Sequence, residues 1–214
     1  MVFDVGETLL DDTREFGAWA DWLGVPRHTF SAVLGAVTAE GRNNVETFQY
    51  FRPGFDLMLE RQRREQAGVG EEFGEQDLYP DVRPALAALG SMGLWVGIAG
   101  NQTARAGQIL RDLNLPADLI ATSAEWNVAK PDSGFFSHVI KAAPGTAAKI
   151  VYVGDHRDND VEPAKAAGMR TAFIRRGPWG YLWADDPKVR KLADWRIRSL
   201  AELPALIQAV NEGS

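Results

Sequence analysis

The chain has 214 residues, of which 45% are hydrophobic and 24% charged, and it contains no cysteine. Disulfides, thiolate metal sites and thiol chemistry are therefore excluded, and the length allows one hydrophobic core with a smaller insert. The formal net charge of −6 argues against a nucleic-acid or membrane partner, because phosphate binding needs a basic face. No segment approaches the roughly 18 apolar residues of a spanning helix. The N-terminus also lacks the pattern of a signal peptide, so we expect a cytoplasmic protein.

The first predicted element is a short strand over residues 2–5. The next segment, residues 12–67, has the periodicity of amphipathic helices. Phe16, Trp19 and Leu23 fall at i, i+3 and i+7, and two further faces of this kind follow them. Glycine and proline pairs separate these faces. The pattern predicts a self-contained helical insert directly after the first strand.

From residue 79 onward, predicted strands alternate with predicted helices. The strands lie at 94–99, 119–122, 149–155 and 170–174. Such alternation is typical of a parallel sheet with helices on both faces. We therefore predict an α/β, Rossmann-like core formed by residues 1–11 and 77–214, and a small all-helical cap domain over residues 12–76. The segment "RRGPWGYLW", residues 175–183, is predicted to be a surface loop.

Polar residues follow the predicted strands at the points where the strands end. Asp4 and Asp155 lie at the ends of the strands over 2–5 and 149–155, Asn101 comes shortly after the strand at 94–99, and Lys130 lies in the connection after the strand at 119–122. In open parallel sheets, ligands bind beyond the carboxyl ends of the strands. A carboxylate pair can hold Mg²⁺, and a lysine can neutralise a phosphoryl group. These residues therefore predict metal-assisted chemistry on an anion.

The segments "FDVGETL", "GIAGN", "AKPDSGFF" and "YVGDHRDNDVEPAKAAGM" together resemble the haloacid dehalogenase-like (HAD) superfamily of hydrolases. They occur in the order found in that family, and the resemblance covers nearly the whole chain. It implies that Asp4 is the catalytic nucleophile and that Lys130 stabilises both the nucleophile and the transferring group. The strand that ends at Asp155 is expected beside the first strand.

The resemblance also implies ligands for a cofactor and a substrate. Mg²⁺ is the expected cofactor, and it would be bound by carboxylates and one backbone carbonyl, from Asp4, Gly6, Asp155 and Asp160. The substrate is expected to be a small phosphorylated molecule, contacted by Gly100, Asn101 and Lys130. The partners implied include no nucleic acid and no membrane, and the chain is expected to be a monomer or a homodimer.

Two positions depart from the family pattern. Most phosphatases of the family have an acid two residues after the nucleophile, where this chain has Gly6. General acid–base help is worth roughly 100- to 10,000-fold, so we expect weakened catalysis on ordinary phosphate esters. The neighbouring Glu7 is expected to point away from Asp4, because side chains alternate along a strand. Gly100 replaces the usual serine or threonine, so one hydroxyl donor to phosphate is missing.

We therefore expect a Mg²⁺-dependent phosphatase that forms an aspartyl-phosphate on Asp4. The main alternative is a degenerate module that binds a phosphorylated ligand or a partner without turnover. A 2-haloacid dehalogenase also lacks the second acid, but the acids of "GDHRDND" argue for a metal site. Phosphonate-cleaving members use a lysine in the cap, and residues 12–75 contain no lysine.

Several of the polar residues also have structural interpretations. Asn101 could cap the helix that starts near residue 103, and Asp160 could cap the helix that begins at Val161. His156 is expected to be a structural loop residue. Arg175 and Arg176 are weaker candidates for contact with an anionic substrate.

Overall fold

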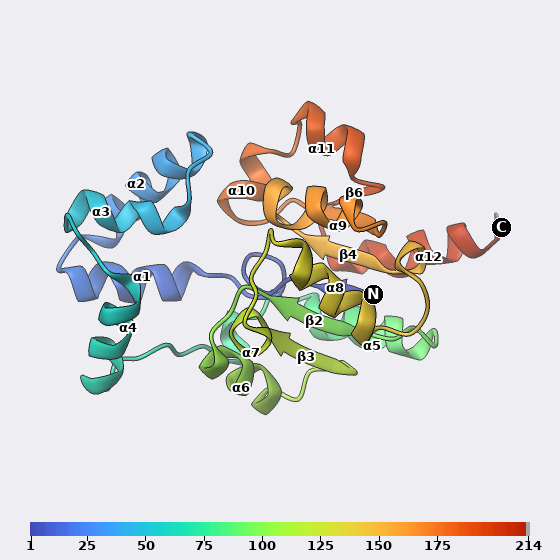
Figure 1. Ribbon diagram of the computed structural model, residues 1–214, viewed down its shortest axis with the longest axis horizontal. Coiled ribbons are helices and arrows are strands. Elements are labelled where there is room, and N and C mark those ends of the chain that lie inside the picture. The colour runs from blue at the N-terminus through green and yellow to red at the C-terminus, as the bar shows by residue number, and fades with distance from the viewer. Residues whose placement is uncertain (213–214) are drawn as a thin grey trace. The chain divides into compact units, whose positions relative to one another are not determined.

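The computed structural model describes residues 1–212 and divides into two compact units. One unit is formed by Met1–Asp11 together with Leu78–Ser214, and the other by Asp12–Asp77. We refer to them as the core unit and the helical unit, and each is described by itself. Figure 1 shows the elements of both units.

The core unit is built on a six-stranded sheet in the order β3-β2-β1-β4-β5-β6, in which all paired strands are parallel. The predicted α/β, Rossmann-like architecture is therefore confirmed. The strands are β1 Val2–Phe3, β2 Gly97–Gly100, β3 Leu119–Thr122, β4 Val151–Gly154, β5 Arg170–Ile174 and β6 Trp195–Ile197. The strand β1 lies in the middle of the sheet, between β2 and β4, so its carboxyl end is central.

Helices connect the strands and cover both faces of the sheet. They are α5 Val82–Ser91, α6 Ala104–Asp112, α7 Ser123–Trp126, α8 Ser133–Ala142, α9 Glu162–Ala166, α10 Gly177–Leu182, α11 Pro187–Leu192 and α12 Leu203–Glu212. In Figure 1, α8 lies in front of the sheet and α5 behind it. Phe135 and Phe136 of α8 are fully buried and pack in the same cluster as Tyr152 of β4. This packing fixes α8 against the strand whose end carries Asp155.

The segment predicted as a surface loop at residues 175–183 contains the helix α10, so that prediction was wrong. Pro178 lies in the first turn of the helix, where proline needs no partner for its missing N–H group. Trp179 and Trp183 are each only 9% exposed and pack with Phe173 of β5. The two indoles make this segment part of the core. The Gly-Pro pair, which is typical of loops, had favoured the wrong prediction.

The helical unit contains α1 Thr13–Leu23, α2 Arg27–Ala39, α3 Thr47–Phe51 and α4 Leu57–Gln66. Its core is largely aromatic and includes Trp19, Phe30, Phe48 and Phe55. The rings of Phe48 and Phe55 stack with centroids 4.5 Å apart. Arg64 is buried against the ring of Trp19 at 4.0 Å, and its charge is paired with a glutamate of α1. Among residues 1–212, no helix is long and apolar enough to cross a bilayer.

Candidate active site

The site lies where β1 and β4 end side by side. The parallel register pairs Phe3 with Val153, and the backbone N–H of Asp4 donates to the carbonyl of Val153 at 2.8 Å. Asp4 and Asp155 therefore follow neighbouring strands at the same edge of the sheet. Each of Asp4, Asp155 and Asp160 offers a carboxylate oxygen, and these oxygens all lie within 4.8 Å of one another. All three residues are buried.

Lys130 is the cation of this cluster. Its Nζ atom lies 2.6 Å from Oδ1 of Asp4 and 2.6 Å from Oδ1 of Asp160. The side chain of Lys130 is 3% exposed, and those of Asp4 and Asp160 are 12% and 1% exposed. An ammonium group so deeply buried between two carboxylates is held by its charges, because burial without partners would cost several kcal/mol.

Asp160 comes five residues after Asp155 in the chain, and two local features place its carboxylate in the cluster. The backbone N–H of His156 donates to Oδ2 of Asp160 at 2.9 Å, inside a turn over Arg157–Val161. Gly154 supplies the space, since a Cβ atom at that position would lie 2.2 Å from Oδ2 of Asp160. The alternative prediction that Asp160 caps the next helix is not what this geometry shows, because its carboxylate faces His156 and Lys130.

His156 has the structural role that the sequence suggested. Burial, followed by the charge of Lys130, lowers its pKa to about 4, so the ring is neutral at pH 7. Its Nδ1 accepts the backbone N–H groups of Asp158 and Asn159, at 3.2 and 3.0 Å. The ring packs against Trp179, 4.5 Å between centroids. The imidazole thus caps the turn that carries Asp160.

Gly100 ends β2 and lies against Asp4, and Asn101 follows the strand and contacts Lys130. The side-chain amide of Asn101 donates to the backbone carbonyl of Lys130 at 2.9 Å and accepts its N–H at 2.7 Å. This pair of bonds fixes the loop that carries Lys130. A Cβ atom on Gly100 would lie 2.6 Å from Oδ1 of Asp4, so the absence of a side chain there leaves room for the Asp4 carboxylate. Neither function was evident in the sequence, and substrate contact by these two residues stays a prediction.

Gly6 and Glu7 lie in the turn that follows Asp4. Gly6 is half-buried and forms an isolated bridge with Leu10. Glu7 has a φ of 52°, so the chain has left the extended conformation on which the alternation argument depended. The carboxylate of Glu7 accepts the hydroxyl of Tyr79 at 2.6 Å. Its charge also contributes to the raised pKa of Asp155, after burial and the charges of Asp160 and Asp4.

The electrostatics of the cluster favour a divalent cation. Burial is the main cause that raises the pKa of Asp4 to about 6, and burial also raises the pKa of Asp155 well above its usual value. Burial alone would lower the pKa of Lys130, but the charges of Asp160 and Asp4 outweigh it and raise that pKa. With all groups ionised, three carboxylates and one ammonium leave two negative charges uncompensated.

One buried atom points to the same conclusion. Oδ2 of Asp155 is buried and has no hydrogen-bond partner among the described residues. A buried carboxylate oxygen without a partner is costly, and a metal ion is one of the groups that satisfies it. Oxygen ligands are those that Mg²⁺ prefers in proteins. The donor set and its charge therefore fit Mg²⁺.

Comparison with known proteins identifies the class to which this site belongs. Residues 1–168 match the haloacid dehalogenase-like hydrolase family. The chain therefore belongs to that family, as the motifs predicted.

Two curated relatives are phosphatases. Glyceraldehyde 3-phosphate phosphatase of Methanocaldococcus jannaschii is 33% identical over 133 residues, which cover 61% of this chain and 56% of the relative. The chain thus spans little more than half the length of that relative. The phosphatase of the same name from Pyrococcus furiosus is 28% identical, and the matched region covers 98% of this chain and 92% of the relative.

A solved structure supports the fold. The HAD hydrolase YfnB from Bacillus subtilis, determined bound to magnesium, has a TM-score of 0.69 and 21% identity, with 96% of each chain covered. Since the identity is low, this likeness concerns the fold.

Proposed function

We propose that the protein is a Mg²⁺-dependent phosphatase of small phosphorylated metabolites, with Asp4 as the nucleophile. The single observation that supports this most strongly is the buried cluster of Asp4, Asp155 and Asp160 with Lys130. The relatives named above are phosphatases of small molecules, in agreement with this proposal. A cytoplasmic location and a monomeric or dimeric state stay predictions.

The cap and the metal ligands are part of the proposal. We infer that the helical unit, Asp12–Asp77, is the cap domain of the enzyme. Asp4, Asp155 and the backbone carbonyl of Gly6 would bind Mg²⁺, with Asp160 binding it directly or through water. When bound, the ion neutralises negative charge on the phosphoryl group.

The side chains of Asp4 and Lys130 supply the remaining chemistry. A carboxylate oxygen of Asp4 attacks phosphorus, and the bond to the ester oxygen breaks. Lys130 stabilises the charge that develops on the transferring group, because its ammonium already contacts Asp4. Water then attacks the acyl phosphate, which restores the Asp4 carboxylate and releases inorganic phosphate. Because Gly6 offers no proton, the leaving oxygen must obtain its proton from water, and good leaving groups are favoured.

Turnover of p-nitrophenyl phosphate tests the proposal. We expect hydrolysis in Mg²⁺, no hydrolysis in EDTA, and no hydrolysis by the Asp4→Asn variant. If the wild-type protein binds Mg²⁺ and shows no turnover of any phosphate ester, the non-catalytic binding module is the correct function. Release of halide from a 2-haloacid in EDTA would instead identify a dehalogenase.

A further inference from the structure

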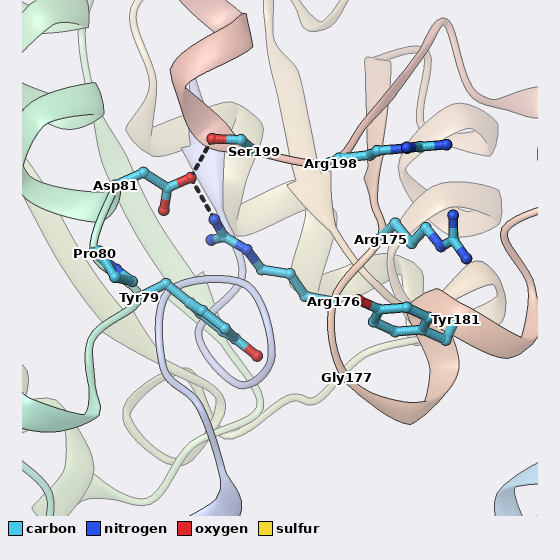
Figure 2. A pocket seen from close by; sticks show the side chains of 9 residues that line it. All are labelled: Tyr79, Pro80, Asp81, Arg175, Arg176, Gly177, Tyr181, Arg198 and Ser199. Atoms are coloured by element: carbon cyan, nitrogen blue, oxygen red, sulfur yellow. Dashed lines mark hydrogen bonds and ion pairs between the residues drawn. The ribbon is translucent and has the colours of Figure 1, made fainter.

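Two cavities meet at the carboxyl ends of β5 and β6, and arginines line both. The larger has a volume of about 440 Å³, and its lining includes Tyr79, Asp81, Arg175, Arg176, Tyr181 and Arg198. The smaller has a volume of about 230 Å³, and its lining includes Arg175, Arg196 and Arg198. Arg175 and Arg198 are shared by the two cavities, and Figure 2 shows both side chains pointing to the same side.

The register of the sheet explains why the arginines gather. Phe173 of β5 pairs with Arg196 of β6, and the backbone N–H of Arg175 donates to Ile197 at 2.9 Å, which continues the pairing. Arg175 and Arg198 come directly after the two strands, two residues beyond this pair, and are therefore neighbours. Arg196 and Arg198 both line the smaller cavity. Like charges on neighbouring strands are destabilising unless something compensates them.

Nearby arginines differ in whether their charge is already paired. Arg176 is only 7% exposed, forms an ion pair with Asp81 and donates to the carbonyl of Thr8 at 2.7 Å. It is a structural residue of the cavity wall, as the dashed line to Asp81 in Figure 2 indicates. Its ring contact with Tyr79, 4.2 Å from the ring centroid, also holds it in place.

Arg175, Arg196 and Arg198, by contrast, form no ion pair in the part of the chain that the structure describes, residues 1–212. Two acids lie near them. Asp185 lines the smaller cavity and is paired with Arg190 at 2.6 Å, and the charges of Arg175 and Arg196 also contribute to its lowered pKa. The carboxylate of Glu202 accepts the backbone N–H of Arg198 at 2.7 Å and forms no ion pair with its guanidinium.

Arg175 carries the clearest sign of a missing ligand. Its Nε atom is buried and has no hydrogen-bond partner among residues 1–212. Its guanidinium lies 4.8 Å from the ring centroid of Tyr181, which orients the group without satisfying its donors. A buried N–H donor without a partner is rare in native structures, and an anion at the cavity mouth would satisfy it.

We propose that Arg175, Arg196 and Arg198 form a second anion-binding site, which takes a small anion of the phosphate class with at least two negative charges. Arginine binds phosphate oxygens through two parallel N–H donors, and three guanidiniums match the charge of such a ligand. The larger cavity has the size of small-molecule sites. The site is separate from the catalytic cluster: β6 lies three strands from β1, roughly 14 Å away, and β5, which Arg175 follows, lies two strands from β1, roughly 10 Å away.

Isothermal titration of the full chain with pyrophosphate in EDTA tests this proposal. Without metal, the catalytic cluster has an excess of negative charge and repels the probe. We expect one binding site in the wild-type protein, and an affinity weakened about tenfold or more in Arg198→Ala and in Arg175→Ala. Arg170→Ala is the matched control, since Arg170 is an exposed arginine at the opposite end of β5. Its affinity should stay within about twofold of the wild type.

Three outcomes would overturn the proposal. One is that the wild-type protein does not bind pyrophosphate. Another is that Arg170→Ala weakens binding as much as Arg198→Ala, which would indicate a diffuse effect of net charge. The third is that Arg198→Ala loses phosphatase turnover in the absence of pyrophosphate, which would make the arginines part of the substrate site. The titration does not depend on turnover, so the phosphatase proposal can fail while this one stands.

Discussion

The ammonium nitrogen of Lys130 lies 2.6 Å from Oδ1 of Asp4, and both groups are nearly inaccessible to water. The two residues are 126 positions apart in the chain, and Asn101 holds the backbone of Lys130 in place. A buried pair of this kind is weak evidence for stability, but breaking it leaves a buried charge without compensation. The pair therefore makes Lys130 important to folding and, under the proposed function, to catalysis as well.

Lys130→Met should abolish most turnover and destabilise the metal-free protein. Removal of the ammonium leaves the buried carboxylates of Asp4 and Asp160 without a cation, at a cost of about 3–5 kcal/mol in the free energy of unfolding. Denaturant unfolding in EDTA measures this. Lys165→Met is the control, because Lys165 forms a partly exposed pair with Asp194 and should cost less than about 1 kcal/mol. Equal effects of the two substitutions would contradict our interpretation of the cluster.

Binding of Mg²⁺ should stabilise the protein more at pH 7.5 than at pH 5.5. Burial raises the pKa of Asp4 from its ordinary value of 3.8 to about 6 in the metal-free fold. Protonation of Asp4 therefore favours the folded state at low pH, and this contribution is lost as pH rises through about 6. Mg²⁺ needs the ionised carboxylate, so protons compete with it at pH 5.5.

Thermal unfolding with Mg²⁺ and with EDTA at the two pH values measures this difference. The shift in Tm caused by Mg²⁺ should be larger at pH 7.5 and should shrink in Asp155→Asn, which removes the carboxylate with the unpartnered oxygen. A shift that is independent of pH, or unchanged in Asp155→Asn, would show that Mg²⁺ binds elsewhere.

Gly6→Asp should raise the turnover of alkyl phosphates more than that of aryl phosphates. An alkoxide is a poor leaving group and gains most from a proton donor, with a ceiling of roughly 100- to 10,000-fold. Steady-state kinetics with an alkyl and an aryl phosphate measure the selectivity. Gly6→Asn is the matched control, because it has nearly the same shape and cannot supply the proton. If Gly6→Asn gives the same gain as Gly6→Asp, or neither gives any, our account of the missing acid is wrong.

Gly100→Ala should lower turnover although it adds only one methyl group. The new Cβ atom would lie 2.6 Å from Oδ1 of Asp4, so the nucleophile must move. A misplacement of a catalytic group by about 1 Å costs roughly 100-fold in rate. Gly90→Ala is the control: Gly90 is an exposed residue of α5, and a Cβ atom there meets nothing within 4 Å. Unchanged turnover in Gly100→Ala would mean that the Asp4 carboxylate does not occupy this position.

The sequence predicted the fold and much of the site, because both depend on local patterns. Strands β3 and β5 have the predicted bounds, Leu119–Thr122 and Arg170–Ile174, since each is a short segment rich in β-branched or apolar residues that follows a turn. Acids at strand ends and a lysine in a strand connection predicted that Asp4, Asp155 and Lys130 lie together, and Lys130 is in contact with Asp4. The place of Asp160 was implied only by the family resemblance, and it also contacts Lys130. Parallel topology alone requires such residues to share one edge of the sheet.

Other features depend on contacts between distant residues and left no local pattern. β6 is only three residues long, and its exposed Arg196 gives no strand periodicity. The use of Asn101 to fix Lys130, rather than to cap a helix, depends on two loops that meet only in the folded chain. The helix cap falls instead to Thr103, whose hydroxyl accepts from Ala106 at 2.9 Å.

The most direct test of the account is a crystal structure of the protein grown with Mg²⁺. We predict one ion bound by a carboxylate oxygen of Asp4, a carboxylate oxygen of Asp155 and the carbonyl of Gly6, each at about 2.1 Å. Oδ2 of Asp155, which has no partner in the described part of the chain, should then face the ion or its water. Carboxylates of Asp4 and Asp155 that bind no ion at millimolar Mg²⁺, or that point into separate environments, would contradict the proposed enzyme.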